Sequence, residues 1–358
     1  MPAFRSGSVL RIISERRGLQ RVEVDLGAGP EKAYVLNELT GPVAPGDPVV
    51  VNTTAVDLGL GTGGWHFVHW NLARSEYIVP GPGHILKARY TSLQTDVGST
   101  EEHLDDEQSE MDTIHGMPVV AAALHSQLPA VAATIRHLRP AARIAYVMTD
   151  GAALPLALSD LVAALRDRSL LDTTITTGHA FGGDYEAVSV YSALAIARNV
   201  AHADVAIVAM GPGIVGTNTR LGFTGIEVGG VLDATTGLGG RPIACLRASF
   251  ADGRGRHQGI SHHTLTTLTV ATQSRVEVPI PEIGDAVERQ LRTELIEAGV
   301  GERHSVTTVA IPDILELLDA TGLHVTSMGR PAAADPVLFQ CAAAAGAASV
   351  NGFEPEMP

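Results

Sequence analysis

The chain has 358 residues, is 45% hydrophobic, and carries a formal net charge of −14 from 25 basic and 39 acidic side chains. This length favours two globular domains. No apolar run reaches the roughly 18 residues that cross a bilayer, so no membrane association is expected. The first residues lack a signal-peptide pattern and the two cysteines cannot form a disulfide framework, so we expect a cytoplasmic protein. Because no general basic footprint exists, nucleic acid is not an expected partner.

Lysine is scarce, with Lys32 and Lys87 the only two in the chain. A P-loop needs a Gly-Lys-Ser/Thr sequence, and Schiff-base chemistry needs a lysine in the active site. Neither lysine lies where the ligand pocket is expected, so both chemistries are disfavoured.

Residues 1–80 predict a small β-barrel-like domain. Five short strand patterns follow one another between turn clusters: GSVLRII, LQRVEVDL, KAYVL, DPVVVN and GWHFVHW. The segment has seven basic and eight acidic residues. Its aromatic residues Trp65, Phe67 and Trp70 are expected in the core rather than on a base-stacking surface. We therefore expect a structural or oligomerisation module, and a homo-oligomer.

Residues 81–115 predict an acidic linker. Eight acidic and two basic residues fall within positions 81–112, and "STEEHLDDEQSEMD" is typical of a solvated loop.

Residues 116–358 predict a doubly wound, mostly parallel, Rossmann-like α/β domain, because near-continuous apolar runs alternate with amphipathic helical patterns. The runs are MPVVAAAL, ARIAYVMT, DTTITT, ADVAIVAM and RPIACLRA, with VTTVAI and GLHVTSM as later strands. The helical patterns are PAVAATIRHL, PLALSDLVAALRD and DYEAVSVYSALAIARNV, the last with Asp184 as its N-cap. A final helix over ADPVLFQCAAAAGAAS is expected to start at Pro336 with Asp335 as its cap.

Polar or glycine-rich turns follow the first five of these strands. Ligands of such sheets bind outside the carboxyl ends of the strands. Each residue there has a structural alternative as a turn, a helix cap or a hydrogen-bonded histidine. Because these polar turns all meet at the carboxyl edge of the sheet, Asp150 and His179 are nevertheless candidate catalytic residues. A divalent metal is a candidate cofactor, with His125, His179, Asp184 and His262 as candidate ligands.

The fourth strand is followed by GPGIVG, whose glycines Gly211, Gly213 and Gly216 match G-x-G-x-x-G. The dinucleotide context is missing, because the loop does not follow the first strand and no acidic residue closes a second strand about 20 positions onward. Glycines at the start of a helix still let backbone N–H groups approach an anion. We expect that helix to begin at Thr217, with Arg220 adding charge. A tight structural turn is the alternative.

Four arginines and a single acidic residue lie in the segment 241–256. The arginines are Arg241, Arg247, Arg254 and Arg256, and the acidic residue is Asp252. Such a patch near a strand end favours an anionic small ligand, and Arg247 is a candidate to bind it. A solvated loop or an oligomer contact is the alternative.

Ser261, His262 and His263 stand where a helical pattern begins. Ser261 is a good N-cap and a candidate ligand-binding residue, so the helix is expected to start at His262. The positive end of the helix dipole disfavours protonation, and neutral imidazoles ligate metals or accept protons. His262 and His263 are therefore candidate catalytic residues, with His262 expected to point into the pocket. The alternative is that both rings face solvent or only pack.

Seven strings together resemble one known family: NTTAVDLGLGTGG, GPGHILKARYTSLQ, AYVMTDGAALP, GHAFGGDYEAV, GPGIVGTNTRLGF, GISHHTL and TSMGR. It is the bacterial family catalogued as domain of unknown function 3866. The resemblance implies that the barrel-like start and the α/β body form one recurring unit. The family has no assigned activity, so it supplies no catalytic residues.

The leading functional hypothesis is an enzyme of the hydrolase or transferase type that acts on an anionic small molecule. Common signatures are missing: no G-x-S-x-G, H-E-x-x-H or paired Cys-x-x-Cys occurs. The alternative is a non-catalytic metabolite sensor in which the N-terminal module transmits occupancy.

Overall fold

The computed structural model describes residues 2–105 and 111–351. The chain forms two compact units that divide between Ser99 and Thr100. The expected acidic linker is therefore shared between the two units, and its residues 106–110 lie outside the described residues. Among the described residues, no helix has both the length and the apolar character needed to cross a bilayer.

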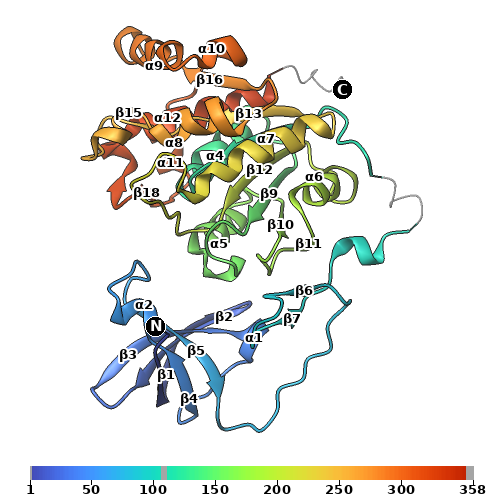
Figure 1. The fold of residues 1–358 in the computed structure, drawn as a ribbon, viewed down its shortest axis with the longest axis vertical. Coiled ribbons are helices and arrows are strands. Elements are labelled where there is room, and N and C mark those ends of the chain that lie inside the picture. Colours follow the sequence, from blue (N-terminus) through green and yellow to red (C-terminus); the bar gives the residue numbers. More distant parts are fainter. Residues whose placement is uncertain (1, 106–110, 352–358) are drawn as a thin grey trace. The chain divides into compact units, whose positions relative to one another are not determined.

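The first unit is a closed barrel of five strands in the order β1-β2-β3-β5-β4 (Figure 1). The strands are β1 (Phe4–Arg16), β2 (Leu19–Asp25), β3 (Pro30–Leu36), β4 (Pro48–Asn52) and β5 (Trp65–Asn71). Short helices α1 (Asn37–Thr40) and α2 (Thr54–Asp57) flank β4, and a small hairpin of β6 (Leu86–Lys87) and β7 (Thr95–Asp96) follows. All five predicted strands are confirmed.

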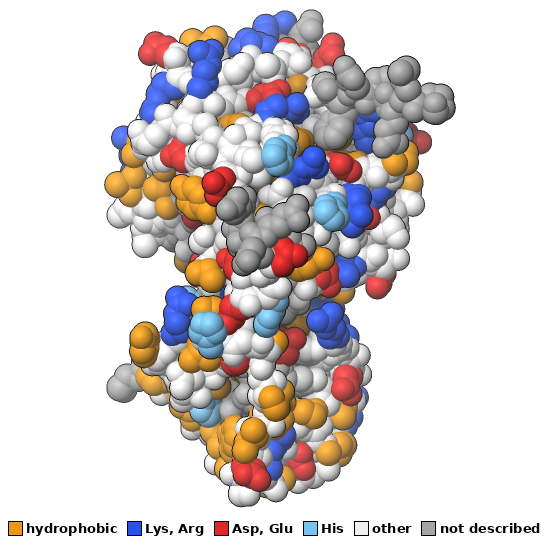
Figure 2. All heavy atoms as spheres, turned by 90° about the vertical axis from the view of Figure 1, so that its right-hand side faces the viewer, with side chains coloured by type: hydrophobic (Ala, Val, Ile, Leu, Met, Phe, Trp, Pro, Cys, Tyr) orange, Lys and Arg blue, Asp and Glu red, His pale blue; other side chains and the backbone are white. Residues whose placement is uncertain are grey.

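The barrel core is aliphatic. It consists of valines from all five strands, Ala33 of β3, and Val43 from the segment before β4. The expectation that the aromatic residues of β5 fill this core is wrong. His66 and Val68 are buried together with Asn71 at the end of the strand, whereas Trp65 and Phe67 alternate with His66 and Val68 on the outer side. Figure 2 shows further apolar side chains on the visible surface of this unit.

The second unit is an α/β domain around an eight-stranded sheet in which every described pair is parallel. Its strands, in spatial order, are β11 (Tyr185–Ala187), β10 (Thr173–Thr177), β9 (Ile144–Thr149), β12 (Val205–Met210), β8 (Pro118–Ala122), β13 (Arg241–Cys245), β16 (Glu277–Pro281) and β17 (Ser305–Val309). The predicted doubly wound, Rossmann-like fold is confirmed.

Alternate residues of the central strands enter two separate cores, because successive side chains point to opposite faces. One face is covered by α4 (Leu128–Leu138), α5 (Asp160–Asp167), α11 (Ile314–Ala320) and α12 (Pro336–Val350). The other is covered by α6 (Val190–Asn199), α7 (Val228–Gly237), α9 (Asp285–Glu297) and α10 (Val300–Arg303). Gly346 lets α12 lie against α4: a Cβ there would be 2.7 Å from the Val131 carbonyl oxygen.

Three local predictions are wrong. Tyr185–Ala187 is the edge strand β11, so Asp184 caps no helix, and α6 begins later with Ser189 as its N-cap. The region after β12 is a loop until the short turn η4 (Thr224–Glu227), so no helix begins at Thr217. The pattern GLHVTSM contains only the two-residue strand β18 (Thr326–Ser327), which pairs with β19 (Arg330–Pro331).

Candidate functional site

The candidate site lies between β13 and α8, at the carboxyl edge of the sheet. Three short elements shape it: β14 (Ala248–Ser249), β15 (Gly259–Ile260) and α8 (His262–Thr266). β14 and β15 pair antiparallel, which folds the chain back on itself. The backbone N–H of Ser261 donates to the Arg247 carbonyl at 2.8 Å, and the Arg247 N–H donates to Thr264 Oγ1 at 3.2 Å. The start of α8 is thereby held beside the end of β13.

Two carboxylates anchor this hairpin. Gly259 has a φ of +68°, and a Cβ there would lie 2.2 Å from Glu294 Oε1. The neighbouring Ile260 N–H donates to Glu294 Oε2 at 2.6 Å. On β14, the Ser249 hydroxyl lies 2.8 and 2.9 Å from the two carboxylate oxygens of Asp335. The hairpin is therefore fixed by α9 on one side and by the start of α12 on the other.

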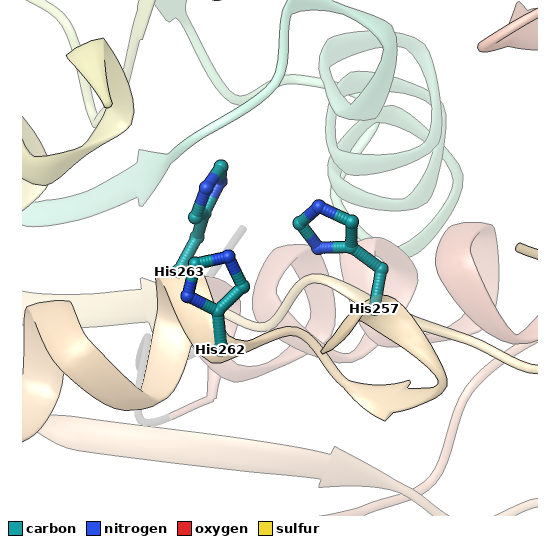
Figure 3. A group of neighbouring side chains, drawn as sticks. All are labelled: His257, His262 and His263. Atoms are coloured by element: carbon teal, nitrogen blue, oxygen red, sulfur yellow. The ribbon is translucent and has the colours of Figure 1, made fainter. Parts of the chain in front are cut away.

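Three histidines converge here. His257 ends the short turn η5 (Gly255–His257), and His262 and His263 form the first turn of α8. One ring nitrogen from each lies within 4.8 Å of the others. The ring centroid of His257 is 5.1 Å from that of His262 and 4.9 Å from that of His263. Figure 3 shows the His257 ring across a gap from the other two.

The predicted helix start is confirmed. Ser261 is the N-cap, and its hydroxyl oxygen accepts from the His263 backbone N–H at 3.2 Å. This bond satisfies one of the free N–H groups of the first turn.

Arg247 sets the tautomer of His263. Its Nη1 lies 3.1 Å from His263 Nδ1, and because a guanidinium only donates, Nδ1 must accept. The proton of the neutral ring is then on Nε2. This nitrogen is buried and has no hydrogen-bond partner among the described residues. His263 therefore presents an unsatisfied N–H donor to the site.

His257 is oriented by two neighbours. Arg256 Nε donates to its Nε2 at 3.4 Å, so Nδ1 carries the proton and donates to Ser261 Oγ at 2.7 Å. The remaining ring, His262, has a buried Nε2 without a partner in the described structure. No hydrogen bond in the described structure therefore fixes which ring nitrogen of His262 carries the proton.

All three imidazoles are neutral at pH 7. Burial, together with Arg247, lowers the pKa of His263 to about 3 and that of His257 to about 4. Burial and then the charges of Arg256 and Arg247 also lower the pKa of His262. The sequence predicted neutral rings from the helix dipole, whereas the main causes here are burial and the neighbouring arginines.

The loop after β12 reaches this cluster. Phe223 stacks on the His263 ring with centroids 3.9 Å apart and planes at 3°. Gly216 lies beside the same ring, since a Cβ there would be in van der Waals contact with His263 Cε1 at 3.5 Å. Further along, the Thr217 N–H donates to the Gly222 carbonyl, which closes a turn that carries Arg220, an exposed residue. The structure thus brings the loop to the histidines without placing its N–H groups at a helix start.

Gly211 and Gly213 lie earlier in the same loop. A Cβ on Gly211 would be 2.7 Å from the Ala153 carbonyl oxygen, so this glycine permits close packing of two strand-end loops. Gly213 has a φ of +106° and open space around its α-carbon. Both glycines have structural reasons to be there.

Arg247 is buried, with 5% of its surface exposed. It forms no ion pair with any carboxylate of the described residues, since nearby Asp252 pairs with Arg254 at 2.7 Å. Burial and the charge of Arg254 lower the pKa of Arg247 to about 10. A second guanidinium, that of Arg256, reaches the cluster and bonds Asn218 of the β12 loop. The site thus combines N–H donors and positive charge.

The cluster of three histidines and two arginines fits a bare divalent cation less well than an anion. Neutral histidines are good metal ligands. However, a metal on His263 Nε2 would require the proton on Nδ1, where the Arg247 guanidinium also donates. The two arginines would repel the cation as well. Among the described residues, no other group of three or more side chains of metal-ligand type converges in this way.

The other predicted residues lie elsewhere on the edge. His125 is hydrogen-bonded through both nitrogens: Nε2 lies 2.7 Å from Ser159 Oγ, and Nδ1 lies 3.2 Å from both the Tyr146 hydroxyl and the Met210 carbonyl. Burial lowers its pKa to about 4. These contacts give His125 a structural role in joining β8, β9, β12 and the start of α5.

Asp150 and His179 are neighbours, because the His179 N–H donates to Asp150 Oδ2 at 2.9 Å. Beside them, Glu227 bonds the hydroxyl of Thr149. Burial, with Asp150 nearby, raises the pKa of Glu227. No sequence pattern pointed to Glu227, which ends the turn before α7 and joins this edge there.

Asp184 is an anchor for the edge strand. Its carboxylate pairs with Arg166 and accepts from the Thr174 backbone N–H at 3.0 Å. His257 and Phe223 are site residues that the sequence reasoning missed. A signal for His257 existed, since three histidines fall within the seven residues 257–263, but the intervening hairpin was not recognised.

The fold and site define a two-part protein: a small barrel joined to a Rossmann-like domain with a histidine–arginine cluster at the carboxyl edge of its sheet. The chain belongs to the family described as "Protein of unknown function (DUF3866)", whose model matches residues 32–346. No curated protein matches. Among solved structures, the chain is similar to YjeQ from Thermotoga maritima at 10% identity and a TM-score of 0.15, over 65% of each chain. This similarity is too low to support any argument about function.

Proposed function

We propose that the chain is an enzyme of the hydrolase or transferase type, in which the cluster of Arg247, Arg256, His257, His262 and His263 binds the anionic group of a small molecule. The observation that carries this proposal is the buried Arg247 guanidinium without a carboxylate partner in the described structure. A charge taken out of water without a counter-ion is strongly destabilising, so this position favours an anionic ligand.

The hydrogen-bond donors support the same ligand class. The unsatisfied Nε2–H of His263 lacks an acceptor, and burial without one is costly. An oxyanion supplies acceptors for this donor and for the guanidinium N–H groups together. Phosphate and carboxylate groups both have the required oxygens.

His262 is the proposed acid–base catalyst. Its ring is neutral at pH 7, and its buried Nε2 has no partner among the described residues. A neutral imidazole beside the bound anion accepts a proton from an attacking hydroxyl or water and returns it to the leaving group. Asp150 and His179 lie on the same edge and remain candidates for contacts with the rest of the substrate.

Thermal unfolding with a panel of anions tests the binding step. Phosphate, pyrophosphate, phosphomonoesters and carboxylates are added to the parent, to Arg247→Met and to the matched control Arg143→Met, whose exposed arginine precedes β9 at the opposite edge. An anion at 100 times its Kd stabilises by about 2.7 kcal/mol, which is a rise in Tm of about 5–10 °C. We expect this rise in the parent and control but not in Arg247→Met. An equal response of all three proteins would refute the anion site.

Conversion of the stabilising ligand tests catalysis. We expect product from the parent by mass spectrometry, and loss of turnover with retained binding in His262→Ala. Recovery of the ligand unchanged after long incubation with the parent would instead assign the protein to the sensor class. Activity that requires added zinc or manganese and disappears with a chelator would show that the histidines hold a metal.

A further inference from the structure

A second cavity lies at the amino edge of the eight-stranded sheet, and its volume is about 340 Å³. Its walls come from α9, α10 and the first residues of β17, together with Arg275, which precedes β16. The helices α9 and α10 lie together at the top of Figure 1. Because the histidine cluster follows the carboxyl end of β13, the amino-edge cavity is a separate site.

The polar wall of the amino-edge cavity is positively charged. It contains Arg275 and Arg292, and none of the described residues that line it is acidic. Arg292 Nη2 lies 3.7 Å from Glu288 Oε1, so its charge is partly balanced. Arg275 is exposed, and its guanidinium has neither an ion pair nor a hydrogen bond within the described structure. Its charge is therefore available to an anion, and a guanidinium matches the geometry of a carboxylate.

His304 adds an unsatisfied acceptor to the same wall. Only 2% of its surface is exposed, and its Nε2 lies 2.8 Å from the Leu268 carbonyl oxygen. Since a carbonyl only accepts, Nε2 carries a proton, and Nδ1 of the neutral ring is an acceptor. Nδ1 is buried and bonds no atom of the described residues. A buried polar atom without a partner is destabilising, so a donor from a ligand would stabilise this wall.

The rest of the lining is aliphatic. Leu295 and Ile296 come from α9 and Val306 comes from β17. Leu295 is fully buried, whereas Ile296 is 65% exposed and borders the opening. The volume is at the lower end of the range for ligand pockets, so the cavity suits a small molecule with an apolar part.

We propose that the amino-edge cavity binds a short branched hydroxy acid. Its carboxylate lies on Arg275 and Arg292, its hydroxyl donates to His304 Nδ1, and its aliphatic end packs on the apolar wall. The arginines would repel a metal cation, and inorganic phosphate would leave the apolar wall uncovered. This proposal does not depend on the anion site at Arg247.

Isothermal titration calorimetry of the full-length chain tests the proposal with three matched probes. Leucate has all three groups, isocaproate lacks the hydroxyl, and isoamyl alcohol lacks the carboxylate. We expect leucate to bind with a Kd of about 1 mM or lower. Isocaproate should bind about fivefold more weakly because one net hydrogen bond is lost, and isoamyl alcohol about tenfold or more weakly.

Variants place the binding site. Arg275→Met should weaken leucate binding about tenfold or more without disturbing the fold, since the side chain is exposed. Ile296→Asp, also at an exposed position, puts a negative charge beside the carboxylate and should abolish binding. The matched control Arg143→Met and the histidine-cluster variant Arg247→Met should both bind leucate as the parent does.

Three results would overturn the proposal: no saturable binding of leucate to the parent, equal affinity of the parent and Arg275→Met, or loss of leucate binding in Arg247→Met alone. The last result would place the hydroxy acid at the histidine cluster. Failure of the anion site itself is distinguishable, because it leaves Arg247→Met and the parent equal toward every anion while Arg275→Met still differs.

Discussion

Replacing Arg247 by methionine removes the charge at the centre of the proposed anion site. Burial, with Arg254 beside it, lowers the pKa of Arg247 well below its usual value, to about 10. At about 1.36 kcal/mol per pKa unit, the folded chain holds this charge at a cost of about 3 kcal/mol. The full cost applies at pH 7.5, because both the folded and unfolded pKa values lie above that pH.

Methionine keeps much of the apolar stem but loses the bond to His263 Nδ1. A hydrogen bond from a charged group contributes about 1.5–3 kcal/mol. The difference predicts that the ligand-free variant is as stable as the parent, or more stable by up to about 1.5 kcal/mol. This result is unusual for a residue with only 5% of its surface exposed.

Urea unfolding at pH 7.5 without anions, followed by circular dichroism, measures this difference. The control Arg143→Met should stay within about 0.5 kcal/mol of the parent. A stabilising anion should then raise the unfolding free energy of the parent and control only. If Arg247→Met loses more than about 3 kcal/mol without ligand, Arg247 is a structural residue and the reasoning fails.

Three further predictions concern stability. Burial lowers the pKa of His263 to about 3, so below pH 6.5 the unfolded chain binds more protons than the folded chain, and the stability contributed by the neutral ring is lost as pH falls. His263→Gln should therefore reduce the slope of unfolding free energy against pH, between pH 4 and 6, by up to about 1.4 kcal/mol per unit. An unchanged slope would contradict this. Gly259→Ala should destabilise by about 2 kcal/mol or more because of its positive φ and the adjacent carboxylate, whereas Gly253→Ala, in open space, should change stability by less than about 0.5 kcal/mol; equal effects would be unexpected. Asp184→Ala should cost about 1–3 kcal/mol in thermal or urea unfolding by leaving the Thr174 N–H without its acceptor, and a neutral result would remove its role as an anchor.

Part of the site followed from local rules. Ser261 as an N-cap predicted where α8 begins, and the bond from the His263 N–H confirms it. The position of Arg247 after an apolar strand predicted that it lies at the carboxyl edge of the sheet. Both inferences hold because capping and strand ends depend on a few neighbouring residues.

Other parts depended on distant residues. His257 joins the cluster only because β14 and β15 pair, and Phe223 joins it from the loop after a different strand. His125 looked like a ligand, but its partners come from three separate elements that no local pattern relates. Asp184 fits an N-cap pattern, yet the edge strand β11 uses the following residues.

The sequence by itself determined the two fold classes, since the period of apolar residues decides whether a segment buries one face or two. It also determined most strands and the start of α8. Tertiary structure alone decided which side of β5 faces the core, because alternation shows that two faces differ but not which one is buried when aromatic and aliphatic residues compete. It likewise decided which histidines meet and, for His263, which ring nitrogen carries the proton, since both depend on contacts between residues far apart in the chain.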